Sequence, residues 1–135
     1  MATRHRLSKH FTVEEFDCRD GTRVAPREYR GLTRLCRLYL EPLRAKYGSV
    51  HVNSGFRTRA YNARIGGAPD SYHIYNIHDG RDQAADITCA RGTPRDWWGT
   101  LNAIRQNKRG GKGGLGLYNS FVHVDLRDYK ADWRG

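Results

Sequence analysis

The sequence has no long hydrophobic run and few cysteines. No stretch of its 135 residues approaches the roughly 18–20 apolar residues that a membrane-spanning helix needs. Its three cysteines, Cys18, Cys36 and Cys89, lie far apart and form no Cys-x-x-Cys pair, which argues against a cysteine zinc site. The basic N-terminus has no apolar stretch behind it, so it does not resemble a secretory signal. We therefore expect a protein without a membrane span, made in the cytoplasm without a signal peptide.

Acidic residues are scarce relative to basic ones. The chain has 14 Asp and Glu against 24 Lys and Arg, which gives a formal net charge of +10. This balance favours a polyanionic partner, either nucleic acid or an anionic polymer of a bacterial wall. The basic residues are spread along the chain and no nucleic-acid motif accompanies them. A nucleic-acid-binding protein or metal nuclease is therefore the weaker alternative, and no nucleic acid is expected as a partner.

Capping signals and hydrophobic spacing predict the main helices. A capping-box pattern at Thr12 and Glu15 starts a short helix. From Pro26 to Tyr47, apolar side chains recur on one helical face, and Pro42 within this stretch is expected to kink or split the helix. The Thr-Pro pair at 93–94 is a strong start signal for a further helix.

Short apolar runs predict the strands. They occur at 49–54, at 84–89, and in a hairpin that joins 115–118 to 121–126. The basic, glycine-rich stretch KRGGKGGLG has no strand–GK[ST]–helix context, so we expect a flexible loop and no phosphate-binding loop. The overall prediction is a single α+β domain, residues 1–135, with a small central antiparallel sheet flanked by helices.

Histidines and aspartates accompany two of these strands. Asp86 lies in an apolar strand, His123 and Asp125 share one face of the last strand, and His73 or His78 precedes the Asp86 strand. Such groups cost several kcal/mol when they are buried unpaired, and a shared divalent metal would satisfy two imidazoles and a carboxylate together. Three protein ligands with a fourth position open is the pattern of catalytic zinc. A hydrogen-bonded His–Asp core pair is the alternative.

Three motifs together resemble the zinc-dependent D-Ala-D-Ala carboxypeptidase and endopeptidase family. They are SGFRTRAYNARIGGAPDSYHIY, AADI and GLGLYNSFVHVDLR. The family includes bacterial wall-peptide hydrolases and the peptidase domains of phage endolysins. Its recurring elements are an S-G-[YF]-R-[ST] turn, an S-x-H leading to an A-x-D strand, and a late strand with the third ligand. All occur here in order, and the resemblance spans roughly residues 10–130.

The resemblance implies a cofactor, a set of site residues and a substrate. One Zn²⁺ per chain would be held by His73, Asp86 and His123. Arg57 would hold a substrate carboxylate or carbonyl, and Ser71 would hydrogen-bond the substrate backbone. The implied substrate is the stem peptide or cross-bridge of peptidoglycan. We expect a monomer that acts on the anionic wall after release at lysis or from a virion.

Two features depart from the family pattern. Twelve residues separate His73 from Asp86, twice as many as the family commonly has, and the inserted loop offers His78 as a rival ligand. The S-x-H context favours His73. Ser120 stands three positions before the last ligand, where many members have an acidic base. Asp125 is then the candidate carboxylate, either as base or as a residue that orients a ligand. Because a serine cannot act as that carboxylate base, Ser120 also favours an alternative function, in which the chain binds wall peptide without cleaving it.

Overall fold

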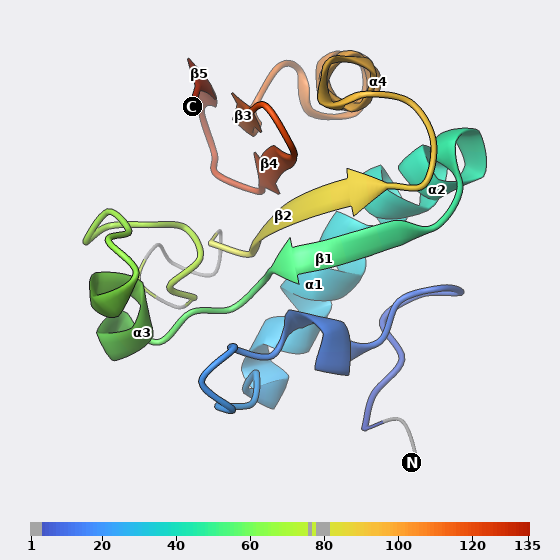
Figure 1. Ribbon diagram of the computed structural model, residues 1–135. Helices are drawn as coiled ribbons and strands as arrows, with labels where there is room; N and C mark the ends of the chain where they lie inside the picture. Colours follow the sequence, from blue (N-terminus) through green and yellow to red (C-terminus); the bar gives the residue numbers. More distant parts are fainter. Residues whose placement is uncertain (1–3, 76, 78–81) are drawn as a thin grey trace.

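The structure is a computed structural model that describes residues 4–75, 77 and 82–135 (Figure 1). Its helices are α1 (Tyr29–Leu35), α2 (Glu41–Tyr47), α3 (Arg59–Arg64) and α4 (Pro94–Arg109), with 3₁₀ turns η1 (Val13–Phe16) and η2 (Pro26–Glu28) and a π-helical segment η3 (Cys36–Leu40). Its strands are β1 (Val50–Ser54), β2 (Ala84–Cys89), β3 (Gly113–Leu117), β4 (Val122–Asp125) and β5 (Lys130–Arg134). The predicted α+β class is confirmed.

The five strands form one mixed sheet in the order β1-β2-β4-β3-β5. The pairs β1–β2, β2–β4 and β4–β3 are antiparallel, as predicted, and the hairpin of β3 and β4 pairs Leu117 with Val122. The predicted antiparallel sheet has one exception at its edge, where β5 runs parallel to β3. This strand alternates between half-buried and exposed residues and has no apolar run, so it carries no hydrophobic strand signal.

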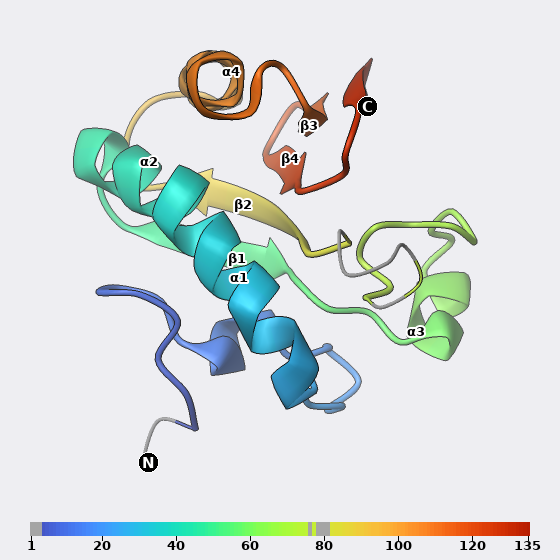
Figure 2. The same ribbon diagram turned by 180° about the vertical axis from the view of Figure 1, so that it is seen from behind.

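A helical run from 29 to 47 packs across β1 and β2, as Figure 2 shows. Its buried residues are the predicted apolar stripe of Leu32, Leu35, Cys36, Tyr39, Leu40 and Leu43, all with no exposed surface. The predicted interruption at Pro42 takes the form of the π-helical segment η3, which precedes it. Proline has no N–H to donate to the carbonyl of Leu38, and a π turn accommodates that loss without ending the helix.

The expected flexible loop at 108–116 is wrong in its second half, because strand β3 begins at Gly113. Two of its glycines face side chains from the neighbouring strands. A Cβ on Gly114 would overlap the Asp125 carboxylate, and a Cβ on Gly116 would lie 2.5 Å from Trp133 Nε1. The glycines therefore leave bare backbone on which these two side chains rest.

Two further findings concern the helices and the cysteines. Among the helices of the described ranges, none combines the length and the hydrophobicity that crossing a bilayer requires. All three cysteines are free thiols, and Cys36 is buried.

Candidate metal centre

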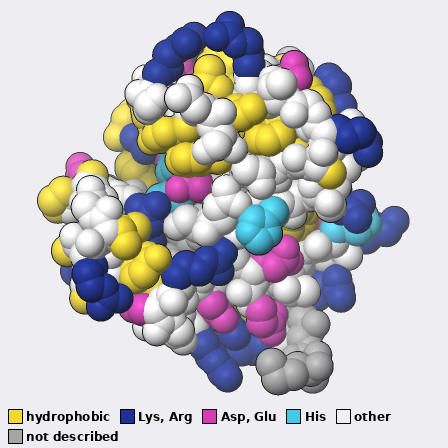
Figure 3. Space-filling model, in the orientation of Figure 1, with side chains coloured by type: hydrophobic (Ala, Val, Ile, Leu, Met, Phe, Trp, Pro, Cys, Tyr) yellow, Lys and Arg dark blue, Asp and Glu magenta, His cyan; other side chains and the backbone are white. Residues whose placement is uncertain are grey.

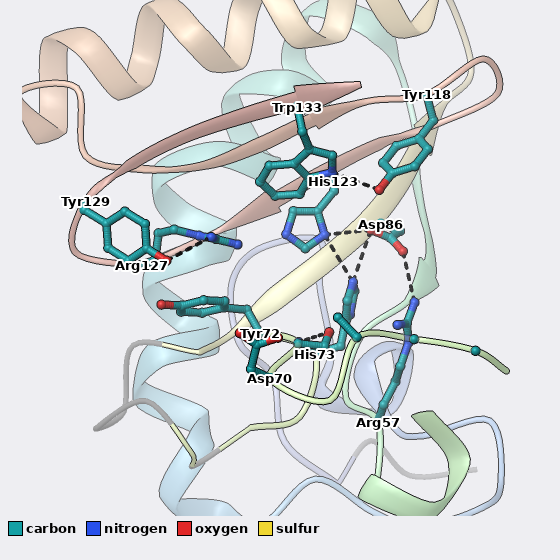
Figure 4. Close-up of a pocket in the computed structure, with 14 residues that line it drawn as sticks. Arg57, Asp70, Tyr72, His73, Asp86, Tyr118, His123, Arg127, Tyr129 and Trp133 are labelled. Carbon is teal, nitrogen blue, oxygen red and sulfur yellow. Dashed lines mark hydrogen bonds and ion pairs between the residues drawn. The ribbon is translucent and has the colours of Figure 1, made fainter. Parts of the chain in front are cut away.

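The sheet register places two of the predicted ligands side by side. Asp86 on β2 and His123 on β4 are direct partners in the antiparallel ladder. His73 lies in the loop between α3 and β2, and its ring meets them at the pocket shown in Figure 4. All three residues are buried. The structure therefore brings together the three residues that the sequence predicted as ligands, while the rival His78 lies outside the described residues.

The three side chains meet through single atoms. His73 Nε2 lies 3.2 Å from Asp86 Oδ1 and 3.2 Å from His123 Nδ1, and His123 Nδ1 lies 2.9 Å from Asp86 Oδ1. Within the described ranges, this is the one group of three or more such side chains close enough to share a metal ion.

The second nitrogen of each imidazole has an acceptor of its own. His73 Nδ1 lies 2.7 Å from the Gly55 carbonyl oxygen, and His123 Nε2 lies 2.7 Å from Asp125 Oδ2. Because a carbonyl and a carboxylate oxygen only accept, these nitrogens carry the ring protons of the neutral histidines. The nitrogens that face Asp86 then carry lone pairs. With both histidines neutral, three acceptors converge with no hydrogen between them, which is the arrangement that a cation requires.

The group also fits zinc by its donor types and spacing. Tetrahedral zinc bonds nitrogen and oxygen at about 2.0–2.1 Å, so its ligand atoms lie about 3.3 Å apart. The observed separations of 2.9–3.2 Å need only a slight expansion to reach that value. Two imidazoles and one carboxylate also leave a fourth position for water or substrate, as in catalytic sites.

The pKa values of Asp86 and His123 also indicate that positive charge is stabilised at this centre. Burial lowers the pKa of His123, but hydrogen bonds to Asp125 and Asp86 raise it to about 9. Burial would raise the pKa of Asp86, but the two histidines bring it well below its usual range. Burial lowers the pKa of His73. In the metal-free protein, His123 therefore also binds a proton at the Nδ1 atom that faces Asp86, and a bound cation would take the place of that proton.

Asp125 is enclosed by hydrogen-bond donors. It has no exposed surface and does not line the pocket. Its Oδ1 accepts hydrogen bonds from Arg127 Nε at 2.9 Å and from the Gly114 N–H at 3.1 Å, and its Oδ2 accepts one from Arg127 Nη2 at 2.7 Å. Asp125 is thus bonded to His123, Arg127 and the Gly114 backbone on the side of His123 away from Asp86.

Arg57 lies in the turn after β1 and touches the centre directly. Its Nη2 lies 3.4 Å from Asp86 Oδ2, while Nε and Nη1 donate to Ser54 and Asn62. The Arg57 N–H also donates to the His73 carbonyl at 2.8 Å. The turn 55–57 is therefore bonded to His73 twice, once through the His73 ring and once through its backbone.

The two predicted serines differ in position. Ser71 lines the pocket, and its hydroxyl accepts the His73 N–H at 3.1 Å, which helps to fix the ligand loop. Ser120 is exposed on the turn between β3 and β4 and is not among the pocket-lining residues.

The pocket has a volume of about 490 Å³, and much of its wall escaped the sequence analysis. The side chains missed are Asp70, Tyr72, Tyr118, Arg127, Tyr129 and Trp133. Arg127 had a detectable signal, because it continues the alternation of His123 and Asp125 on one face. Trp133 had none, since it lies on the edge strand β5 that the sequence did not reveal.

The chain was compared with curated proteins, with solved structures and with sequence models of protein families. None of the curated proteins or solved structures matches the chain. The sequence model of peptidase M15, however, matches residues 9–125, which include all three proposed ligands. The chain therefore belongs to the peptidase M15 family, a family of zinc peptidases of the D-Ala-D-Ala carboxypeptidase type.

Proposed function

We propose that the chain is a zinc-dependent peptidase that hydrolyses the stem peptides or peptide cross-links of peptidoglycan, as a D-Ala-D-Ala carboxypeptidase or endopeptidase. The observation that carries the proposal is the convergence of one potential ligand atom each from His73, Asp86 and His123 at the wall of an open pocket. Family membership supports both the metal and the class of substrate.

The residues of the pocket take distinct roles in this proposal. His73, Asp86 and His123 hold one zinc ion, which when bound polarises a carbonyl and lowers the pKa of a water molecule towards about 7. Arg57 keeps guanidinium hydrogens beyond its three bonds and binds a substrate carbonyl or carboxylate. Ser71 donates its hydroxyl hydrogen to the substrate backbone.

Asp125 is assigned to positioning. Its Oδ2 holds His123 in the tautomer that presents Nδ1 to the metal, as carboxylates beside ligating histidines commonly do. Removal of a proton from the attacking water needs a group that reaches the pocket. Asp70 is the one carboxylate besides Asp86 among the described lining residues, and it is our candidate for that step.

The surface suits an anionic wall. In Figure 3, Lys and Arg side chains are spread over the visible face and do not form one concentrated patch. A net charge of +10 distributed in this way favours retention on anionic wall polymers. Salt screens this attraction, so retention should weaken as the salt concentration rises. We propose that the chain acts as a single domain and a monomer, since the pocket is formed within one chain, and that it reaches the wall as a phage endolysin at lysis or from a virion.

A second candidate is a module that binds wall peptide without cleaving it. It is favoured by Ser120, which stands where many family members have an acidic base and lies outside the pocket. The metal and the peptide would bind as in the first proposal, but no bond would be broken.

The test combines zinc content with digestion of purified peptidoglycan. Elemental analysis of the wild type should give about one zinc per chain, and mass spectrometry should show new peptides whose termini identify the bond. His123→Ala should lose both zinc and products, whereas His51→Ala, at an exposed position on β1, should lose neither. Zinc without products would support the binding module. Neither zinc nor products would refute both proposals.

A further inference from the structure

The last ten residues, 126–135, lie beyond the region that the family model matches, yet they build one wall of the pocket. Arg127, Tyr129 and Trp133 all line it. The segment is firmly attached to the domain. The fully buried Arg105 on α4 pairs with Asp132 on β5 at 2.8 Å and donates to the Gly113 carbonyl at 3.1 Å.

Trp133 is held in one position against the metal centre. It pairs with Gly116 in the parallel ladder, and its indole covers the space that a side chain on Gly116 would fill. Its ring centre lies 5.0 Å from that of His123. Its Nε1–H donates a hydrogen bond to the Tyr118 hydroxyl at 2.9 Å. The edge strand therefore fixes a tyrosine beside the proposed ligands.

Tyr118 has an unused hydrogen. Its ring stacks on Phe121, with centres 4.3 Å apart and planes 9° from parallel. Because an indole N–H can only donate, the Tyr118 oxygen is the acceptor in its bond to Trp133. The hydroxyl hydrogen has no acceptor among the described residues. Figure 4 shows the hydroxyl on the side of the pocket where Asp86 and His123 lie.

We propose that Tyr118 is a further catalytic residue of this centre and that Trp133 is its positioning residue. The inference rests on the proposed peptidase function. When water attacks the scissile carbonyl carbon, negative charge develops on the carbonyl oxygen, and Tyr118 O–H donates a hydrogen bond to it. The phenol keeps its proton throughout. Figure 4 places Tyr118 and Arg57 on either side of Asp86, so the two donors approach the reacting carbonyl from different directions.

A donor of this kind accelerates the reaction only if its direction is set in advance. Removing one preorganised oxyanion donor typically lowers kcat by about 10²–10³-fold. The Trp133 bond and the Phe121 stack supply that preorganisation, because they leave the Tyr118 hydroxyl little freedom to rotate away.

The kinetic test compares Tyr118→Phe and Trp133→Phe with wild type on the peptide bond that the wild type cleaves. Tyr118→Phe should lower kcat about 100-fold, leave KM within about twofold, and keep one zinc per chain. Trp133→Phe should lower kcat about 10-fold, since the Tyr118 hydroxyl remains but no longer accepts the hydrogen bond that orients it. The double variant should be no slower than Tyr118→Phe, because the two residues act as a unit. Tyr61→Phe, on α3 and outside the pocket lining, serves as the control.

Two further readouts do not depend on turnover. A phosphinate analogue of the cleaved bond mimics the tetrahedral oxyanion, so Tyr118→Phe should weaken its binding by about the same factor as kcat and leave product binding unchanged. In metal-free protein, the indole N–H resonance of Trp133 should shift in Tyr118→Phe, while those of Trp97 and Trp98 should not.

The outcomes separate this inference from the proposed function. Wild-type activity with full activity in Tyr118→Phe would overturn the role of Tyr118 and leave the peptidase standing. A higher KM with unchanged kcat would also overturn it, since the hydroxyl would then bind the ground state and the transition state equally. Zinc binding without any turnover by the wild type would refute the peptidase, and this inference with it.

Discussion

Asp86 and His123 are direct partners across β2 and β4, and their Oδ1 and Nδ1 atoms lie 2.9 Å apart. The backbone of two central strands therefore sets the distance between two of the proposed ligands. The register is itself fixed by burial, because Val122 and Val124 on the opposite face of β4 have no exposed surface. The core of the domain and the spacing of the metal centre thus depend on the same strand alternation.

Metal removal should lower thermal stability. A ligand that binds only the folded state at 100 times its Kd stabilises it by about 2.7 kcal/mol, which raises Tm by several degrees in a domain of this size. Dialysis against a chelator should lower Tm, and added zinc, but not magnesium, should restore it. An Asp86→Ala variant whose Tm responded to zinc as the wild type does would contradict the proposed ligand set.

Asp125→Asn distinguishes the two roles predicted for this residue. If Asp125 orients His123, the amide should weaken zinc binding about 10–100-fold, and activity should return at saturating zinc. Zinc competition with a chromophoric chelator measures the first effect, and peptide hydrolysis measures the second. Unchanged zinc affinity with lost activity would assign Asp125 to proton transfer instead. Circular dichroism controls for folding, since the variant also disturbs the pair with Arg127.

The glycines of β3 should resist substitution. Gly116→Ala would place its methyl group 2.5 Å from Trp133 Nε1, so we expect a loss of about 1–3 kcal/mol in the free energy of unfolding. Gly99→Ala is the matched control, because it lies in α4 with no atom within 4 Å of the new methyl group. It should stabilise by about 0.5–1 kcal/mol. Urea unfolding measures the change in the free energy of unfolding for both variants. If Gly116→Ala and Gly99→Ala changed it in the same direction, the contact between Gly116 and Trp133 would not explain the effect.

Arg105→Met should loosen the C-terminal strand. The fully buried guanidinium bonds Asp132 and the Gly113 carbonyl, so its removal should cost about 2–4 kcal/mol. Hydrogen exchange should become faster in β5 and at the start of β3 than in β1, because β5 and β3 lose bonds to Arg105 and β1 does not. Arg95→Met, at an exposed site in the first turn of α4, should change stability by less than about 0.5 kcal/mol. Uniform exchange rates across the sheet would contradict this role.

The sequence predicted the elements whose signals are local. Residues 84–89 were predicted as a strand and form β2, and the Thr-Pro pair at 93–94 starts α4 with a complete capping box. Asp86 and His123 were found because ionisable groups in apolar strands need partners, and His73 was preferred to His78 because it stands in the S-x-H motif of the family. In each case the information lies within a few neighbouring residues.

The parts that were missed depend on distant contacts. Residues 115–118 were predicted as a strand, but the glycines at 113 and 114 that begin β3 were predicted as a loop, because glycine has little strand propensity and the Asp125 carboxylate that rests on Gly114 comes from the neighbouring strand. The edge strand β5 is held by Arg105, which lies more than twenty residues earlier on α4. No local pattern marks such pairings, so neither β5 nor the aromatic wall of the pocket could be read from the sequence.

The two bonds between the turn 55–57 and His73 have a thermodynamic consequence. The Gly55 carbonyl holds the His73 ring, and the Arg57 N–H holds the His73 backbone. A substrate group that reduces the motion of Arg57 therefore also reduces the motion of the proposed metal ligand His73. In the same way, a metal that holds His73 in place also restricts Arg57. Linkage requires the two affinities to change by the same factor, so substrate and metal should each increase the retention of the other.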